Sequence, residues 1–124
     1  HLDTSPVMVQ GSPKMLEELI YNLIDNAIRY NRPEGQVYVS VKKEDGLVVL
    51  RVRDTGIGIE KKHLDSIFER FYRVDKSRSK ETGGTGLGLA IVKHIIVQHK
   101  AKIEVKSEVL KGTEMIVTFK ETDE

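Results

Sequence analysis

Three polar side chains in the segment 13–30 have a spacing that suits a phosphate ligand. Asn22, Asn26 and Arg29 lie four and then three residues apart, so in a helix they form one polar stripe beside an apolar face. An asparagine carbonyl can coordinate Mg²⁺ without adding negative charge near a phosphate, and a guanidinium pairs with phosphate oxygens. A solvated helix face would have the same pattern.

A carboxylate followed by two glycines forms a second candidate site. Residues 54–58 read Asp-Thr-Gly-Ile-Gly, and Asp54 falls on the same face of the preceding strand as the apolar residues Val48, Leu50 and Val52. A buried carboxylate is costly unless it accepts hydrogen bonds, and the exocyclic amine of adenine would donate one. Gly56 and Gly58 would let the backbone approach a flat ligand. An ordinary turn that begins with Asp is the alternative.

A glycine-rich stretch at residues 83–90 opens an apolar helix. Free backbone N–H groups and small residues at a helix N-terminus make an anion site, although a hinge without a ligand would also be glycine-rich. Neither glycine stretch completes the dinucleotide-binding fingerprint, because Lys61 and Ile91 occupy the positions of the third glycine. No Gly-Lys pair exists in the chain, which excludes a P-loop.

The segment between the two glycine stretches, residues 69–85, has no sustained hydrophobic period and is expected to be a long mobile loop. Within it, residues 70–80 contain five basic residues and one acidic residue, a local charge of +4 that suits a polyphosphate or a solvated charged loop. Three aromatic residues could anchor its start or offer a face to a base: Phe68, Phe71 and Tyr72.

Hydrophobic periodicity predicts the elements that position these residues. Ser12 and Pro13 are a favoured N-cap and first helical residue, and helical apolar spacing then continues from Leu16 until Asn31 and Pro33. Residues 37–41 and 47–53 alternate on either side of Asp45-Gly46, which predicts an antiparallel hairpin.

The remaining expected elements complete the fold class. They are a short strand at 7–10, a short helix within 60–68, a second apolar helix at 86–99, and strands at 103–105 and 115–119. This order predicts an α+β two-layer α/β sandwich, with helices on one face of a mixed, mostly antiparallel sheet.

Composition limits the chain to one domain of ordinary globular type. The 124 residues include 20 basic and 19 acidic residues, and this balance argues against a nucleic-acid-binding surface. The absence of cysteine excludes disulfides, cysteine zinc sites and thiol nucleophiles. No apolar run approaches the roughly 20 residues that span a bilayer. His63, His94 and His99 lack metal-ligand spacing, so we expect surface or packing roles.

The motifs together resemble those of the catalytic and ATP-binding domain of bacterial sensor histidine kinases, which has the Bergerat ATP-binding fold. The N box of that family resembles residues 22–27, the G1 box 54–58, the F box 68–73 and the G2 box 84–88. Four boxes in the right order and spacing make the resemblance specific, and it covers nearly all of residues 1–124. Residues 31–35 also resemble phosphate-regulon sensors.

The resemblance implies a role for individual residues. Asn26 would coordinate Mg²⁺, Asn22 and Arg29 would contact phosphates, Asp54 would bond the adenine amine, and Arg73 would reach the γ-phosphate, with Asn26 and Arg73 the catalytic pair. The other implied ATP-binding residues are Tyr30, Gly56, Gly58, Tyr72, Gly84, Thr85, Gly86, Leu87 and Gly88. Residues 69–85 would be an ATP lid. Arg29 departs from the more usual Lys, and Ser12 from the more usual Asp.

The resemblance further implies that the γ-phosphoryl group of Mg-ATP passes to a histidine on a separate helical dimerisation domain, in two-component signal transduction. None of the four histidines here is followed by an acidic residue, so the acceptor is expected outside this chain, and the isolated chain should not phosphorylate itself. Asn22 stands where related gyrase and chaperone ATPases have a Glu that activates water, so hydrolysis should be slow.

The implied setting is a cytoplasmic domain of a membrane-anchored parent that passes its signal to a response regulator, with no nucleic-acid or membrane contact by this domain. Two rival functions share the nucleotide pocket: a serine kinase of the anti-sigma type and a nucleotide-sensing module without catalysis. The long lid and residues 68–73 favour the histidine kinase over the first. Intact Asn26, Asp54 and Arg73 argue against the second.

Overall fold

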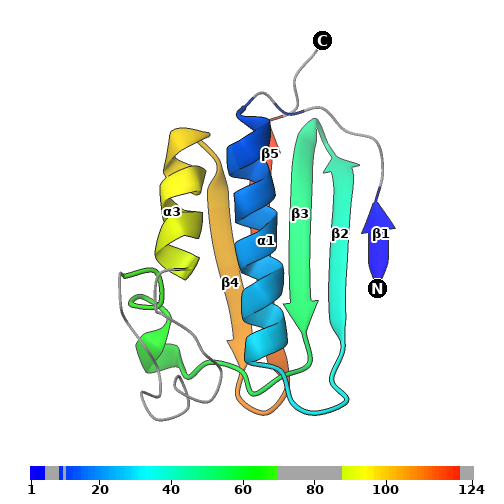
Figure 1. Ribbon diagram of the computed structural model, residues 1–124, viewed down its shortest axis with the longest axis vertical. Helices are drawn as coiled ribbons and strands as arrows, with labels where there is room; N and C mark the ends of the chain where they lie inside the picture. The colour runs from blue at the N-terminus through cyan, green and yellow to red at the C-terminus, as the bar shows by residue number, and fades with distance from the viewer. Residues whose placement is uncertain (5–8, 10, 70–87, 121–124) are drawn as a thin grey trace.

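The computed structural model describes residues 1–4, 9, 11–69 and 88–120. Within them, two helices cover one face of a five-stranded sheet (Figure 1). The strand order is β1-β2-β3-β5-β4, in which β1 and β2 are parallel and the other three pairs are antiparallel. The expected two-layer sandwich, with helices on one face of a mixed, mostly antiparallel sheet, is therefore confirmed.

Helix α1, Pro13–Arg29, begins where the sequence predicted. Ser12 is the N-cap, and its hydroxyl accepts a hydrogen bond from the Met15 backbone N–H at 3.3 Å. Pro13 occupies the first turn, where no backbone donor is needed. The helix buries Leu19, Leu23 and Ala27 against the sheet and thereby fixes which side of α1 faces the core.

Strands β2, Val37–Glu44, and β3, Leu47–Asp54, form the predicted hairpin. Its two turn residues, Asp45 and Gly46, have φ values of 51° and 78°, the left-handed geometry that a tight two-residue turn requires. The inward residues of β3 belong to the apolar core, and Asp54 ends the same face. The alternation thus placed this carboxylate correctly.

Strands β4, Lys102–Glu108, and β5, Gly112–Lys120, form the second hairpin, and β5 pairs with β3 in the middle of the sheet. Helix α3, Gly88–Gln98, packs beside α1 over these strands (Figure 1). Its buried residues are Val92, Ile95 and Ile96. The part of the expected helix at residues 86 and 87 lies outside the described residues.

Two sequence predictions of elements were wrong or only partly right. Of the strand expected at 7–10, only Val9 is among the described residues, and it is not in a strand. The structure has a strand that the sequence did not predict, β1, Leu2–Thr4. The helix expected within 60–68 is a single 3₁₀ turn, Lys61–His63, followed by further turns. Most backbone N–H groups of this segment donate to the carbonyl three residues earlier, as His63 does to Glu60. A segment this short forms too few hydrogen bonds to offset the cost of starting an α-helix.

Neither described helix is long and apolar enough to cross a bilayer.

Candidate functional site

The buried carboxylate of Asp54 is the centre of the site. Its side chain lies at the end of β3 and the residue is 7% exposed. Oδ1 accepts hydrogen bonds from the backbone N–H of Gly56 at 2.9 Å and of Thr113 at 3.3 Å. Within the described residues, the hydrogen bonds to this carboxylate reach only Oδ1. The second oxygen, Oδ2, is therefore available to a ligand that donates a hydrogen bond.

The environment of Asp54 also affects its protonation. Burial raises the pKa of the Asp54 carboxyl above its ordinary value, while the hydrogen bonds from Gly56 and Thr113 oppose that rise. A donor from a bound ligand would stabilise the charged form in the same way, so the site favours a hydrogen-bond donor over an acceptor.

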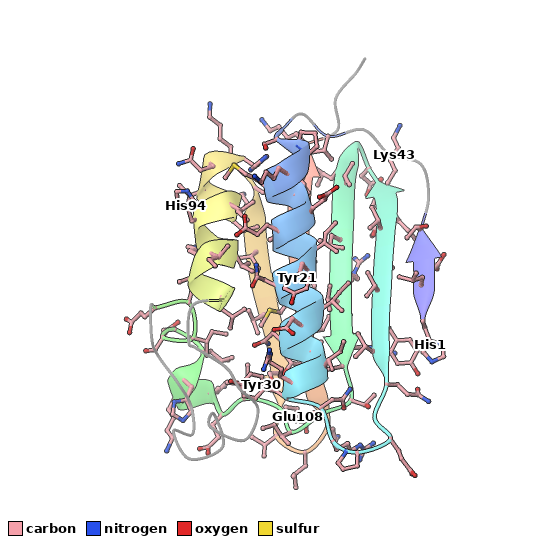
Figure 2. The ribbon with its side chains drawn as sticks, in the orientation of Figure 1. His1, Tyr21, Tyr30, Lys43, His94 and Glu108 are labelled. Atoms are coloured by element: carbon pink, nitrogen blue, oxygen red, sulfur yellow. The ribbon has the colours of Figure 1, made fainter. Side chains whose placement is uncertain are left out.

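The two glycines after Asp54 are required by packing of backbone on backbone. A Cβ at Gly56 would lie 2.3 Å from the Tyr30 carbonyl oxygen, and one at Gly58, where φ is 74°, would lie 2.2 Å from that of Glu108. The Ile57 N–H donates to the Tyr30 carbonyl at 3.3 Å. The turn after β3 is thus held between the end of α1 and the β4–β5 turn, where Figure 2 shows Tyr30 and Glu108 at the same end of the sheet.

The first residue of the polar stripe of α1, Asn22, faces the beginning of α3. The Asn22 amide Nδ2 donates to the Glu18 carbonyl at 2.7 Å, which leaves its Oδ1 as an acceptor. A Cβ at Gly88 would lie 3.2 Å from that Oδ1, so these two expected site residues are neighbours although 66 positions apart in sequence. Asn26, one turn further along, is half-buried.

Arg29 is engaged by a neighbour on its own helix. Its Nε donates to Asp25 Oδ2 at 2.7 Å, an i,i+4 ion pair in which both side chains are about one-third exposed (35% and 34%). The hydrogen bond and charge of Asp25 raise the pKa of Arg29 above its ordinary value. The Arg29 guanidinium, the last member of the stripe, is therefore positioned by Asp25 and stays protonated.

A polar network fixes the loop between α1 and β2 beside the turn after Asp54. Thr55 and Gln36 exchange two hydrogen bonds: the Thr55 N–H donates to the Gln36 carbonyl at 3.1 Å, and the Gln36 N–H donates to Thr55 Oγ1 at 2.8 Å. The Asn31 side-chain amide donates to the same Gln36 carbonyl at 2.9 Å. This loop and the turn therefore form one connected wall of the site.

Six expected site residues lie outside the described residues, as does the expected lid from residue 70 onward. They are Tyr72, Arg73, Gly84, Thr85, Gly86 and Leu87. Among the expected residues that are described, Tyr30, Asp54 and Gly56 lie together at the C-terminal end of α1. Asn22 and Gly88 lie together nearer the middle of that helix.

Thr113 and Ser107 were missed by the sequence analysis. Thr113 is 7% exposed, its N–H bonds Asp54, and its hydroxyl lies 2.8 Å from the Ser107 hydroxyl. Alternation along β5 would have placed Thr113 on the inner face. Its pairing with Asp54 depends on the register of two strands far apart in sequence, which no local pattern gives.

The described residues contain no group of three or more His, Cys, Asp and Glu side chains that could hold a metal ion. The Asn26 amide fits a different mode, because Mg²⁺ keeps several waters and is usually held by one or two protein oxygens together with substrate phosphates. His99 has a packing role: its Nε2 accepts from the Ser12 N–H at 3.2 Å, and its Nδ1 lies 2.9 Å from the Ile95 carbonyl.

Comparisons with known proteins identify the family of this chain. The model of the family described as histidine kinase-, DNA gyrase B- and HSP90-like ATPase matches residues 11–123. The phosphate regulon sensor protein PhoR of Pseudomonas aeruginosa is 44% identical over 119 residues, which are 95% of this chain and 27% of that protein. The chain thus spans about a quarter of the length of such relatives.

Solved structures give the same result for the fold. The mycobacterial sensor histidine kinase MprB superposes with a TM-score of 0.84 at 29% identity, over 98% of this chain and 80% of that one. Full-length ShkA, solved in complex with AMPPNP, superposes with a TM-score of 0.75 at 25% identity, over 98% of this chain and 26% of that one.

Proposed function

Since the chain belongs to the histidine kinase-, DNA gyrase B- and HSP90-like ATPase family and has the fold of a histidine kinase catalytic domain, we propose that it binds Mg-ATP beside α1 and β3. We further propose that it transfers the γ-phosphoryl group to a histidine of a separate helical domain. The observation that carries the proposal is the buried Asp54, whose Oδ1 is occupied by two backbone donors.

Asp54 recognises the adenine. Its Oδ2 accepts a hydrogen bond from the exocyclic amine, and the donated bond stabilises a carboxylate that burial alone makes costly. Gly56, Gly58 and Tyr30 shape the turn around the base, because their backbones are in close contact with α1 and the β4–β5 turn. A complex of the relative ShkA with the ATP analogue AMPPNP supports ATP as the ligand.

The polar stripe of α1 receives the phosphates. Asn26 holds Mg²⁺, which when bound neutralises phosphate charge during phosphoryl transfer. Asn22 presents its Oδ1 towards Gly88 at the start of α3, and Arg29 supplies a positive charge from the next turns of α1. Residues 69–85 act as the lid. Tyr72 and Arg73 of the lid, together with the glycine-rich stretch 84–88 at its end, complete the phosphate site.

The γ-phosphoryl group of ATP is transferred to a protein histidine and not to water. Asn22 is an amide and has no basic atom with which to activate water, and its Nδ2 is already bonded to the Glu18 carbonyl. ATP bound here therefore persists until the acceptor histidine arrives. Catalysis rests on positioning and charge neutralisation by Asn26 and Arg73.

The acceptor histidine lies on a dimerisation domain of a longer sensor protein, which passes the phosphoryl group to a response regulator. The likeness to PhoR over 27% of its length supports a parent with further domains. We place this domain on the cytoplasmic side of a membrane-anchored parent, in contact with neither lipid nor nucleic acid.

Labelling with γ-³²P-ATP tests the proposal on the longer protein that contains this chain. We expect a label that survives alkali and is lost in acid, as phosphohistidine is, and its absence when Asn26 is replaced by Leu. An Asp45→Asn variant, changed in the exposed hairpin turn, should label normally. A label that resists acid, or one that Asn26→Leu leaves unchanged, contradicts the proposal.

A further inference from the structure

We propose that Ser107 is a positioning residue for base recognition, holding both segments that fix the buried carboxylate of Asp54. The proposal rests on the proposed function, because it assumes that Asp54 accepts a hydrogen bond from the adenine amine. Ser107 lies on the inner face of β4, one residue before that strand ends. It does not touch Asp54 itself, so its effect must pass through other residues.

Three polar groups surround the Ser107 hydroxyl. Its Oγ lies 2.7 Å from the Ile59 backbone N, 3.1 Å from the Gly112 carbonyl oxygen and 2.8 Å from Thr113 Oγ1. These partners come from the turn after β3 and from the start of β5. Ser107 therefore joins the end of β4 and the start of β5, which are neighbours in one hairpin, to the turn after β3, 48 residues earlier in the sequence.

The donors and acceptors around Ser107 have one arrangement that satisfies all of them. The Ile59 N–H donates to Oγ, and the Gly112 carbonyl, which can only accept, takes the single hydroxyl proton of Ser107. The Thr113 hydroxyl then donates to Ser107 Oγ. With two bonds accepted and one donated, the Ser107 hydroxyl is saturated, and its removal leaves the Ile59 N–H and the Thr113 hydroxyl without this partner.

Both donors to Asp54 Oδ1 belong to segments that Ser107 holds. Gly56 lies in the turn that ends at Ile59, and the Thr113 N–H belongs to the residue whose hydroxyl bonds Ser107. Oδ1 is fixed by these two donors, so the direction of Oδ2 depends on where the two segments lie. Loss of the Ser107 hydroxyl should let both shift and should misdirect Oδ2 relative to the base.

Other contacts between the same segments make the hairpin turn a support for the base site. The Leu110 N–H donates to the Ile57 carbonyl at 2.9 Å, and Gly58 packs on the Glu108 carbonyl. These contacts use backbone atoms, so no side chain can be truncated to remove them. Ser107 supplies the side-chain link among them and is therefore the position where this support can be tested.

The experiment compares two variants of equal shape, Ser107→Thr and Ser107→Val, which differ in the hydroxyl group and both suit a strand. Calorimetry in the presence of Mg²⁺ measures the affinity of each for AMPPNP and for purine riboside triphosphate, which lacks the 6-amino group. The control is Ser40→Val, because Ser40 lies on β2 and on the face of the sheet opposite to the core. Unfolding midpoints of all variants are measured first, and Ser107→Cys replaces Ser107→Val if the latter does not fold.

We expect Ser107→Val to bind AMPPNP roughly tenfold more weakly than the unmodified chain and to bind the nucleotide without the amine almost unchanged. Ser107→Thr and Ser40→Val should bind both normally. Equal weakening towards both nucleotides would show a general structural role and overturn the inference, as would no weakening at all. If the unmodified chain binds neither nucleotide, the proposed function fails and this inference fails with it.

Discussion

Replacement of Asp54 by Asn separates recognition of the base from stability of the fold. The backbone N–H groups of Gly56 and Thr113, at 2.9 and 3.3 Å from Oδ1, require an acceptor at that position. The amide oxygen must therefore take the place of Oδ1, and the amide nitrogen the place of Oδ2. A donor would then face the adenine amine, which is itself a donor.

The expected loss of affinity follows from the bond that disappears. A hydrogen bond to a charged group contributes about 1.5–3 kcal/mol, so Asp54→Asn should bind an ATP analogue roughly tenfold to a hundredfold more weakly. Guanine carries a carbonyl where adenine carries its amine, and a carbonyl can accept from the new amide. The ratio of ATP to GTP affinity should therefore fall by at least as much as the affinity for ATP.

Stability should change in the opposite direction. Burial raises the pKa of Asp54 in the folded state. The free energy of unfolding therefore falls as the pH rises from the ordinary aspartate pKa to the raised one. Above the raised pKa, the full cost of burying the charged carboxylate is present. Asn has no charge to bury. At neutral pH the variant should therefore be at least as stable as the unmodified chain, and its advantage should shrink as the pH falls towards about 4.

Calorimetry with ATP and GTP analogues plus Mg²⁺, together with thermal unfolding at pH 7 and pH 4, measures both effects. Asp45→Asn is a matched control, because Asp45 is exposed and its φ of 51° is one that Asn tolerates. An unchanged ratio of ATP to GTP affinity would refute the assigned role of Asp54. A lower unfolding temperature at pH 7 would refute the account of its burial.

Three further predictions concern the acceptor, the lid and the second hairpin. The isolated chain incubated with γ-³²P-ATP should acquire no alkali-stable, acid-labile label, since none of its histidines is followed by an acidic residue; such a label would contradict this. Amide hydrogen exchange across residues 69–85 should slow when Mg-ATP is added, and strong protection without nucleotide would contradict the lid assignment. Gly112→Ala should destabilise the fold more than Gly46→Ala in chemical denaturation. Both glycines have a positive φ, which costs a residue with a side chain about 1–3 kcal/mol. Only at Gly112 would a Cβ also lie 2.0 Å from the Asp54 carbonyl oxygen. Equal losses of unfolding free energy in the two variants would contradict this prediction.

The features predicted well from the sequence are those specified by neighbouring residues. The start of α1 is indicated by two adjacent residues, Ser12 and Pro13, and the inward direction of Asp54 by alternation within one strand. Strand β1 was missed because its three residues are exposed and show no alternation. It is held in part by backbone pairing, as in the Val39 N–H that donates to the His1 carbonyl at 2.9 Å.

The residues proposed for the candidate site were found from the sequence for a similar reason. Asn22, Asn26 and Asp54 stand out because their residue types and local spacing carry the chemistry. Thr113 and Ser107 do not, because their contacts with Asp54 and Ile59 depend on strand register and on the path of a turn. The packing reason for Gly58 likewise depends on the β4–β5 turn, 50 residues further along the chain.

The proposal that this chain binds Mg-ATP is tested most directly by a calorimetric titration with AMPPNP, with and without Mg²⁺. We expect saturable binding that is stronger with Mg²⁺. Asn26→Leu should remove the dependence on Mg²⁺, and Asp54→Asn should weaken the binding. No detectable heat and no thermal shift at millimolar nucleotide with Mg²⁺ would contradict it.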